Sequence, residues 1–249
     1  MLIELLNLIL IVTIVMIQSI VGVGVLVLGT PTLLLLNFSI VDAMNFLLPI
    51  SILTSLSNIL IMKFKNDSLS YNFKRFKSFF LICIPFVLIG LIILKYSNKY
   101  VNYDYIVSLV IILTLIFRNR VAKILKNLSS KLNKIILIII GVIHGMTNSG
   151  GTLLSIFLVN LNKSKKDSRS EITLFYFFLA ITQLILFYFV FGLIYKDYKF
   201  YFIIFCIFLG IILGNILLKY TTESFFRKLV FLLALISSIS LFLKNIIFN

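Results

Sequence analysis

Long apolar runs alternate with short polar stretches along the whole chain. Measured against the roughly 20 residues that a membrane-spanning helix needs, the pattern predicts an all-α integral membrane protein with eight hydrophobic segments. These segments are Leu2–Leu36, Ile40–Met62, Ser78–Leu94, Val101–Phe117, Ile135–Leu161, Ile172–Tyr195, Phe200–Leu218 and Leu229–Leu243.

Two of these segments contain a polar, glycine-bearing interruption. The first is Gln18–Gly24, inside a run whose only charged residue is Glu4, and the second is His144–Gly151. In lipid, a helix break survives only where it faces protein or a water-filled site, because no water is present to satisfy the freed backbone groups. Two broken segments in matching positions of two halves indicate the binding site of a secondary transporter.

The two halves of the chain share one order of segments, a long broken one followed by three plain ones. A shift of 126 positions places His144 on Gln18 and Gly150 on Gly24. We therefore expect a single membrane domain, 1–249, divided into repeat one (1–117), a basic cytoplasmic linker (118–134) and repeat two (135–249). Within the linker, the pattern over 121–128 predicts a short amphipathic helix on the membrane surface.

The positive charges between the segments test the topology. If every segment crosses once, 14 Lys and Arg residues lie on one side and nine on the other. If both broken segments instead enter and leave on the same side, the distribution becomes 18 against five. Because positive residues gather on the cytoplasmic side, the second topology is favoured. Each half is then a re-entrant hairpin followed by three transmembrane helices, so the repeats are inverted, and the two hairpin tips are expected to meet near the membrane midplane.

Composition excludes an ordinary soluble protein. Of the 249 residues, 61% are apolar and only 12% are charged, about half the charged fraction of a soluble domain. The net charge of +15 comes from Lys and Arg between apolar segments, which contact the lipid bilayer, so nucleic acid is not an expected partner. No cleavage site follows the first segment, which we expect to be structural. Cys83 and Cys206 lack metal or redox spacing, and neither a metal nor a cofactor is predicted.

The chemistry expected at the two breaks is the binding of a small anion. A half-helix that starts inside the membrane leaves its first N–H groups unpaired and carries a partial positive charge there. All eight acidic residues lie in loops or near segment ends, whereas cation transporters usually need an inward carboxylate. The candidate substrate-binding residues are Gln18, Ser19, Gly22, Gly24, Pro31, Asn45, Thr147, Asn148, Ser149, Gly150, Gly151 and Gln183.

His144, the only histidine, is a candidate for proton coupling, and a hydrogen-bonded helix neighbour is the alternative. An uncoupled, channel-like permease with the same site remains open, as does a membrane scaffold. An intramembrane hydrolase using Ser149 and His144 is a further alternative, although five residues apart on a helix the two side chains point about 140° away from each other. Gly210 and Gly214 have the spacing of a helix-packing motif and are candidates for a homodimer contact.

These residues resemble the sulfite exporter family TauE/SafE, small bacterial permeases with two related halves. The match follows the order Gln18, Gly22, Gly24 and Pro31, then Asn148–Gly151 and the aromatic run 175–178. Many members have a denser glycine cluster at the first break and a proline after the second glycine pair, where this chain has neither. The resemblance implies a multi-pass protein of the bacterial inner membrane that transports a small sulfur-containing or organic anion, such as sulfite, thiosulfate or a sulfonate.

Overall fold

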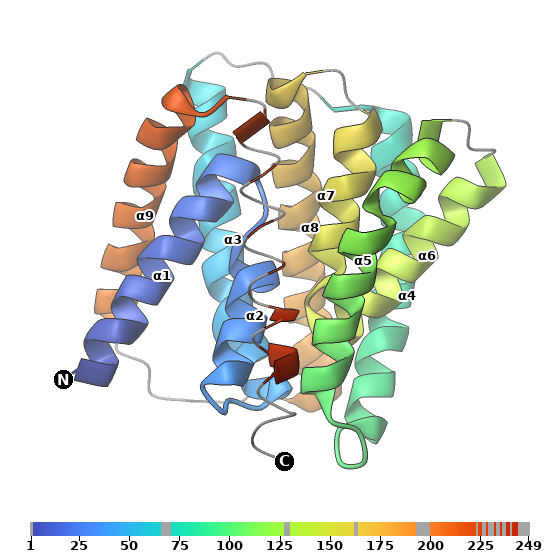
Figure 1. Ribbon diagram of the computed structural model, residues 1–249, viewed down its shortest axis with the longest axis horizontal. Coiled ribbons are helices and arrows are strands. Elements are labelled where there is room, and N and C mark those ends of the chain that lie inside the picture. The colour runs from blue at the N-terminus through green and yellow to red at the C-terminus, as the bar shows by residue number, and fades with distance from the viewer. Residues whose placement is uncertain are drawn as a thin grey trace.

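In the computed structural model every described element is a helix (Figure 1). The structure describes residues 2–65, 71–126, 130–161, 164–192 and 200–222, together with isolated positions between 224 and 243. The helices are α1 (Leu2–Val21), α2 (Val25–Leu35), α3 (Ile40–Phe64), α4 (Phe73–Ser97), α5 (Tyr103–Lys126), α6 (Ser130–Thr147), α7 (Gly150–Leu161), α8 (Lys165–Phe191) and α9 (Phe200–Tyr220). Within the described ranges, α3, α4, α8 and most of α9 are long and apolar enough to cross a membrane.

Both predicted interruptions are confirmed as helix breaks, although they are shorter than the polar stretches suggest. The first occupies residues 22–24 between α1 and α2, and the second residues 148–149 between α6 and α7. In Figure 1, α1 rises and α2 descends, so α3 starts on the side of the molecule where the N-terminus lies. α6 descends and α7 rises, so α8 starts on the side opposite to the start of α3. We call α1–α2 the first hairpin and α6–α7 the second.

The helices that follow the two hairpins begin in the same way. Ser39 caps α3 by accepting a hydrogen bond from the N–H of Asp42, and Ser164 caps α8 by accepting one from the N–H of Asp167. In each case a serine satisfies a backbone donor and an acid three residues later lies in the first turn, where the helix dipole favours negative charge. This local chemistry fixes where the chain turns out of each hairpin.

Helices from the two halves of the chain pack against one another. α4 packs on α6, α9 on α1, and α3 on α8. Gly90 of α4 and Gly145 of α6 bring two backbones into contact, since a Cβ on either would lie 3.0 Å from the Cα of the other. Such small residues let membrane helices approach closely and gain dispersion energy. α3 and α8 lie at the centre, where α8 contacts both hairpins and α3 contacts the first hairpin and α8.

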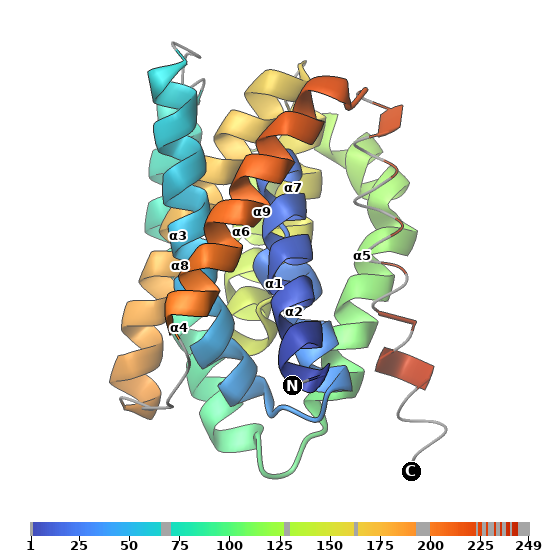
Figure 2. The same ribbon diagram turned by 90° about the vertical axis from the view of Figure 1, so that its left-hand side faces the viewer.

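Gly210 and Gly214 belong to α9, which runs along α1 (Figure 2). A Cβ on Gly210 would lie 2.8 Å from the carbonyl oxygen of Val12, and one on Gly214 would lie 2.6 Å from that of Met16. The predicted homodimer contact through this pair is therefore wrong in its location, because the same chain already covers both glycines.

The basic linker also differs from its prediction. Residues 118–126 continue α5, and residues 130–134 form the first turn of α6, so the short separate helix expected over 121–128 does not form as an independent element. The side chains of residues 118–126 and 130–132 are not described, and neither are residues 127–129. Most of the eighth predicted segment, Leu229–Leu243, lies outside the described residues.

Candidate functional site: the two helix breaks

The first break is shaped by two glycines with different tasks. Gly22 has a φ of 92°, a conformation that glycine adopts without strain, and its N–H still bonds the carbonyl of Gln18 at 2.7 Å. A Cβ there would lie 2.9 Å from the hydroxyl of Thr173 in α8. Gly24 has extended backbone, and a Cβ on it would lie 2.7 Å from the backbone nitrogen of Gln18. The break is therefore tightly packed against α8 and the end of α1.

Gln18 holds the first break in place with both ends of its amide. Its Nε2 donates to the carbonyl of Ser51 and to the hydroxyl of Ser55, both at 3.0 Å. Its Oε1 accepts the N–H of Val25, the first residue of α2, at 2.9 Å. Gly24 supplies no side-chain cap, so the capping acceptor for α2 comes from the preceding helix. This candidate residue therefore has a clear positioning role.

Ser19 joins four helices through a buried arginine. Its carbonyl accepts hydrogen bonds from Nε and Nη2 of Arg169, at 3.0 and 2.7 Å, and its hydroxyl accepts one from Asn58. Arg169 also donates to the Asn215 side chain at 3.1 Å. Arg169 precedes the predicted segment Ile172–Tyr195, but α8 begins at Lys165, so Arg169 lies in the second turn of α8 and is 7% exposed.

The second break relies on an asparagine where the first has a glycine. Asn148 has a φ of 60°, which asparagine tolerates better than most residues, and its N–H bonds the carbonyl of His144 at 2.9 Å. Its side chain donates to Thr30 of α2 at 3.2 Å and accepts from Gln183 of α8 at 2.9 Å. Gln183 also donates to the His144 carbonyl at 3.0 Å. The second break is thus tied to α2 and α8.

The two breaks lie at different levels along α8, contrary to the expectation that the hairpin tips meet. The first contacts Thr173 and the second bonds Gln183, and ten residues of α helix span about 15 Å. Phe178, the middle residue of α8, lies halfway between these two positions. The hairpins therefore pass one another, with the starts of α2 and α7 side by side near the middle of α8.

Several buried polar atoms in this central region make no hydrogen bond within the described part of the chain. They are both ring nitrogens of His144, Oε1 of Gln183 and the hydroxyl of Tyr176. All three residues are 0% exposed, and the rings of His144 and Tyr176 lie edge to face with centroids 6.3 Å apart. An unsatisfied buried polar group costs about 1–3 kcal/mol, so this concentration next to two helix starts suits a site that a ligand completes.

Tyr176 is the central residue that the sequence analysis did not select. It reads as one member of the aromatic run 175–178, a composition typical of a buried apolar helix. The signal that would have found it is helical spacing, since Arg169, Thr173, Tyr176 and Gln183 lie on one buried face of α8, at intervals of four, three and seven residues. This face contacts both breaks.

The remaining candidates play smaller parts. Pro31 lies buried inside α2, and Asn45 is buried in the second turn of α3. The Thr147 hydroxyl donates to the carbonyl of Ile143 and accepts from the N–H of Ser149, so both residues serve the turn of the second break.

The hydrolase alternative requires a hydrogen bond between nucleophile and base. The hydroxyl of Ser149 instead donates to the carbonyl of Thr147 at 3.2 Å, and neither ring nitrogen of His144 has a partner among the described residues. The structure therefore does not form the dyad. Within the same residues, no three His, Cys, Asp or Glu side chains are grouped as metal ligands.

A groove of about 680 Å³ lies between the first half of α1 and the start of α9. Its lining is almost entirely apolar and includes Leu8, Val12, Phe202 and Phe205. A surface of this kind suits lipid chains and offers an anion few donors. The helix breaks remain the stronger candidate site.

Interrupted helices buried among apolar spanning helices, with unpartnered polar groups of the described residues beside their starts, define a multi-pass membrane protein of the transporter class. The model of the sulfite exporter TauE/SafE family matches residues 7–241, nearly the whole chain. The chain belongs to this family, which confirms the resemblance seen in the sequence, and it is a membrane transporter. No curated protein and no solved structure gives a match.

Proposed function

We propose that this protein is a secondary transporter of the bacterial inner membrane that carries a small sulfur-containing or organic anion. The observation that carries the proposal is the pair of helix starts in the middle of the protein, each next to buried polar groups without partners. The side chains that hold the two breaks in place through hydrogen bonds are neutral amides and hydroxyls. Neutral donors of this kind favour anions and release them readily, as transport requires.

An inverted-repeat design gives these features a common origin. The φ angles of Gly22 and Asn148 are both positive at positions 126 residues apart. The α4–α6 contact has its counterpart in the α9–α1 contact, as expected if a twofold axis in the membrane plane exchanges the halves. Rocking of one repeat against the other would then expose the centre to each side in turn.

The proposed function is tested by anion flux in proteoliposomes. Purified protein should carry at least one of sulfite, thiosulfate and sulfoacetate faster than chloride, relative to protein-free liposomes. Gly24→Ala and Gly150→Ala should lose most of this flux, because the added methyl groups would lie 2.7 Å from the Gln18 nitrogen and 2.5 Å from the His144 Cβ. Gly29→Ala is the matched control, since its methyl meets the flexible side-chain ends of Leu47 and Ile14.

Loss of flux in all three glycine variants would indicate a general packing defect. Absence of flux for every sulfur anion, with the wild type monodisperse and folded, would refute the proposed substrate class.

The proposed topology makes a separate prediction. Ser39 and Ser164 begin α3 and α8, the helices that leave the two hairpins. Single cysteines at these positions, in a background lacking Cys83 and Cys206, should react with an impermeant maleimide from opposite sides of the membrane. Labelling of both from the same side would rule out inverted repeats.

A further inference from the structure

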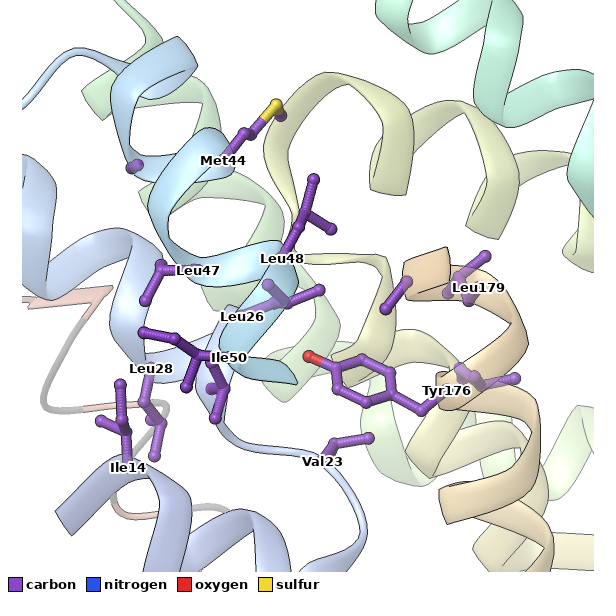
Figure 3. Packing of buried hydrophobic residues seen from close by; sticks show 14 of the residues in the cluster. Ile14, Val23, Leu26, Leu28, Met44, Leu47, Leu48, Ile50, Tyr176 and Leu179 are labelled. Atoms are coloured by element: carbon purple, nitrogen blue, oxygen red, sulfur yellow. The ribbon is translucent and has the colours of Figure 1, made fainter. Parts of the chain in front are cut away.

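Tyr176 directs its hydroxyl at the start of α2. Figure 3 shows the ring extending from α8, with the hydroxyl oxygen at its tip directed toward Leu26 and Ile50. The hydroxyl faces the backbone of Leu26 and Val27 and the side chain of Ser51. None of these makes a hydrogen bond of normal geometry with it, although the residue is completely buried.

The N–H groups that face this hydroxyl are two from the first turn of α2 that have no carbonyl partner in the backbone. The N–H of Val25 bonds the Gln18 side chain, and the N–H of Leu28 is the first to bond a backbone carbonyl, that of Gly24, at 2.8 Å. Between them, the N–H groups of Leu26 and Val27 bond no backbone carbonyl within the described part of the chain and instead face the Tyr176 oxygen. Three donors, two amides and one phenol, thus converge on one buried point at a helix N-terminus.

We propose that the Tyr176 hydroxyl and the N–H groups of Leu26 and Val27 form the anion subsite, and that this subsite selects singly charged anions. The inference rests on the proposed transport function and adds to it the binding residue and the charge of the substrate. A phenol can donate one hydrogen bond to an anion, and the two amides can each donate another, aided by the helix dipole.

The selection for charge follows from the neutrality of these donors. Ser51 and Gln18, the polar side chains beside them, are uncharged. The ionised residues in the early turns of α8 are engaged elsewhere: Glu171 pairs with Arg75 at 3.2 Å, and Arg169 bonds Ser19 about two turns from Tyr176. Desolvation energy in a low-dielectric site rises with the square of the charge. Dipoles of this strength can therefore hold a monoanion far better than a dianion.

Tyr176 also connects the two hairpins. A Cβ on Gly151, in the first turn of α7, would lie 2.5 Å from the Tyr176 ring and 3.1 Å from Val27 of α2. The ring thus fits between the starts of α2 and α7, and Gly151 makes the space for it. Any movement of the second hairpin against the first would shift the hydroxyl relative to the α2 amides, which couples anion binding to the movement of the repeats.

The simpler alternative is that Tyr176 only caps α2 by accepting from its amides. The two roles differ in what removal of the hydroxyl does. A cap contributes stability, typically about 1 kcal/mol, so its loss lowers the unfolding temperature and leaves transport intact. A hydroxyl that hydrogen-bonds only to a ligand contributes no stability to the ligand-free protein. Its loss therefore leaves the unfolding temperature unchanged or raised, but impairs transport.

The experiment compares the wild type with Tyr176→Phe and with Tyr188→Phe, the same change on a half-exposed face of α8. Sulfite and thiosulfate influx into proteoliposomes is measured in slightly acid and slightly alkaline buffers, and thermal unfolding is measured in detergent. Sulfite changes between its singly and doubly charged forms in this range, whereas thiosulfate stays doubly charged. We expect wild-type sulfite flux to follow the singly charged form and to exceed thiosulfate flux at least tenfold.

In Tyr176→Phe the sulfite flux should fall roughly tenfold to hundredfold, the loss expected for one hydrogen bond to a charged group, with no fall in unfolding temperature. Tyr188→Phe should match the wild type. Unchanged flux in Tyr176→Phe, or thiosulfate flux equal to that of sulfite, would overturn the inference and leave the transport function standing. A wild type that carries neither sulfite nor thiosulfate would overturn the inference, and the proposed substrate class would be refuted only if sulfoacetate were not carried either.

Discussion

A single methyl group added at Gly145 is expected to lower the free energy of unfolding by about 3 kcal/mol, the upper range for overpacking. The Cβ of Gly145→Ala would lie 3.0 Å from the Cα of Gly90 and from the backbone nitrogen of Leu91, and closer still to the carbonyl oxygen of Val87. All three atoms belong to the backbone of α4, so no side-chain rotation relieves the contact. The helices must separate, and the dispersion energy of their close packing is lost.

The matched control is Gly29→Ala, which adds the same group in a buried helix. There the nearest atoms are methyl ends of Leu47 and Ile14, at 2.8 to 3.3 Å, and these side chains can rotate. The gain in helix propensity, about 1 kcal/mol, partly offsets the remaining strain. Reversible unfolding in detergent or bicelles would measure both variants. Equal destabilisation would contradict the backbone contact between α4 and α6.

The sequence locates the helix breaks well but does not give their length. Glycine and polar residues mark both positions because lipid tolerates an interruption only inside protein. The breaks are short because α1 and α6 continue to bond at their ends: the N–H of Gly22 still reaches Gln18, and that of Asn148 still reaches His144. The chain then leaves each helix at a positive φ angle, at Gly22 and at Asn148, that the surrounding helices hold in place, and no local pattern predicts these angles.

The errors of the sequence analysis at individual residues have one cause: a local sequence pattern carries no information about contacts with distant parts of the chain. Tyr176 becomes informative only when the start of α2, some 150 positions earlier, is brought against it. Arg169 lies before the predicted apolar segment in the sequence. It is buried in the structure because Ser19 and two asparagines provide hydrogen-bond acceptors inside the protein. Gly210 and Gly214 predict close helix packing correctly, but their spacing is the same whether the partner helix belongs to the same chain or to a second copy.

Gln18 and Gln183 are expected to respond very differently to the same substitution. Gln18 uses both its amide nitrogen and its oxygen, with Ser51, Ser55 and Val25 as partners. In Gln18→Leu, three hydrogen bonds are lost and the N–H of Val25 is left unpaired in the membrane. At about 0.6 kcal/mol for each membrane hydrogen bond and about 1–3 kcal/mol for the unpaired donor, the expected loss of stability is about 3–5 kcal/mol.

Gln183→Leu removes two hydrogen bonds of the amide nitrogen, to His144 and Asn148, but it also removes an oxygen that has no partner among the described residues. The His144 carbonyl keeps the N–H of Asn148 as a donor. Removal of the unsatisfied Gln183 oxygen offsets the cost of leaving the Asn148 side-chain oxygen without its donor, so the net loss should be about 1 kcal/mol or less. Unfolding free energies of the two variants, measured side by side, would decide the comparison. If Gln183→Leu proved the more damaging, the Gln183 oxygen would have to serve the folded protein itself, and the second break would hold its helix start as firmly as Gln18 holds the first.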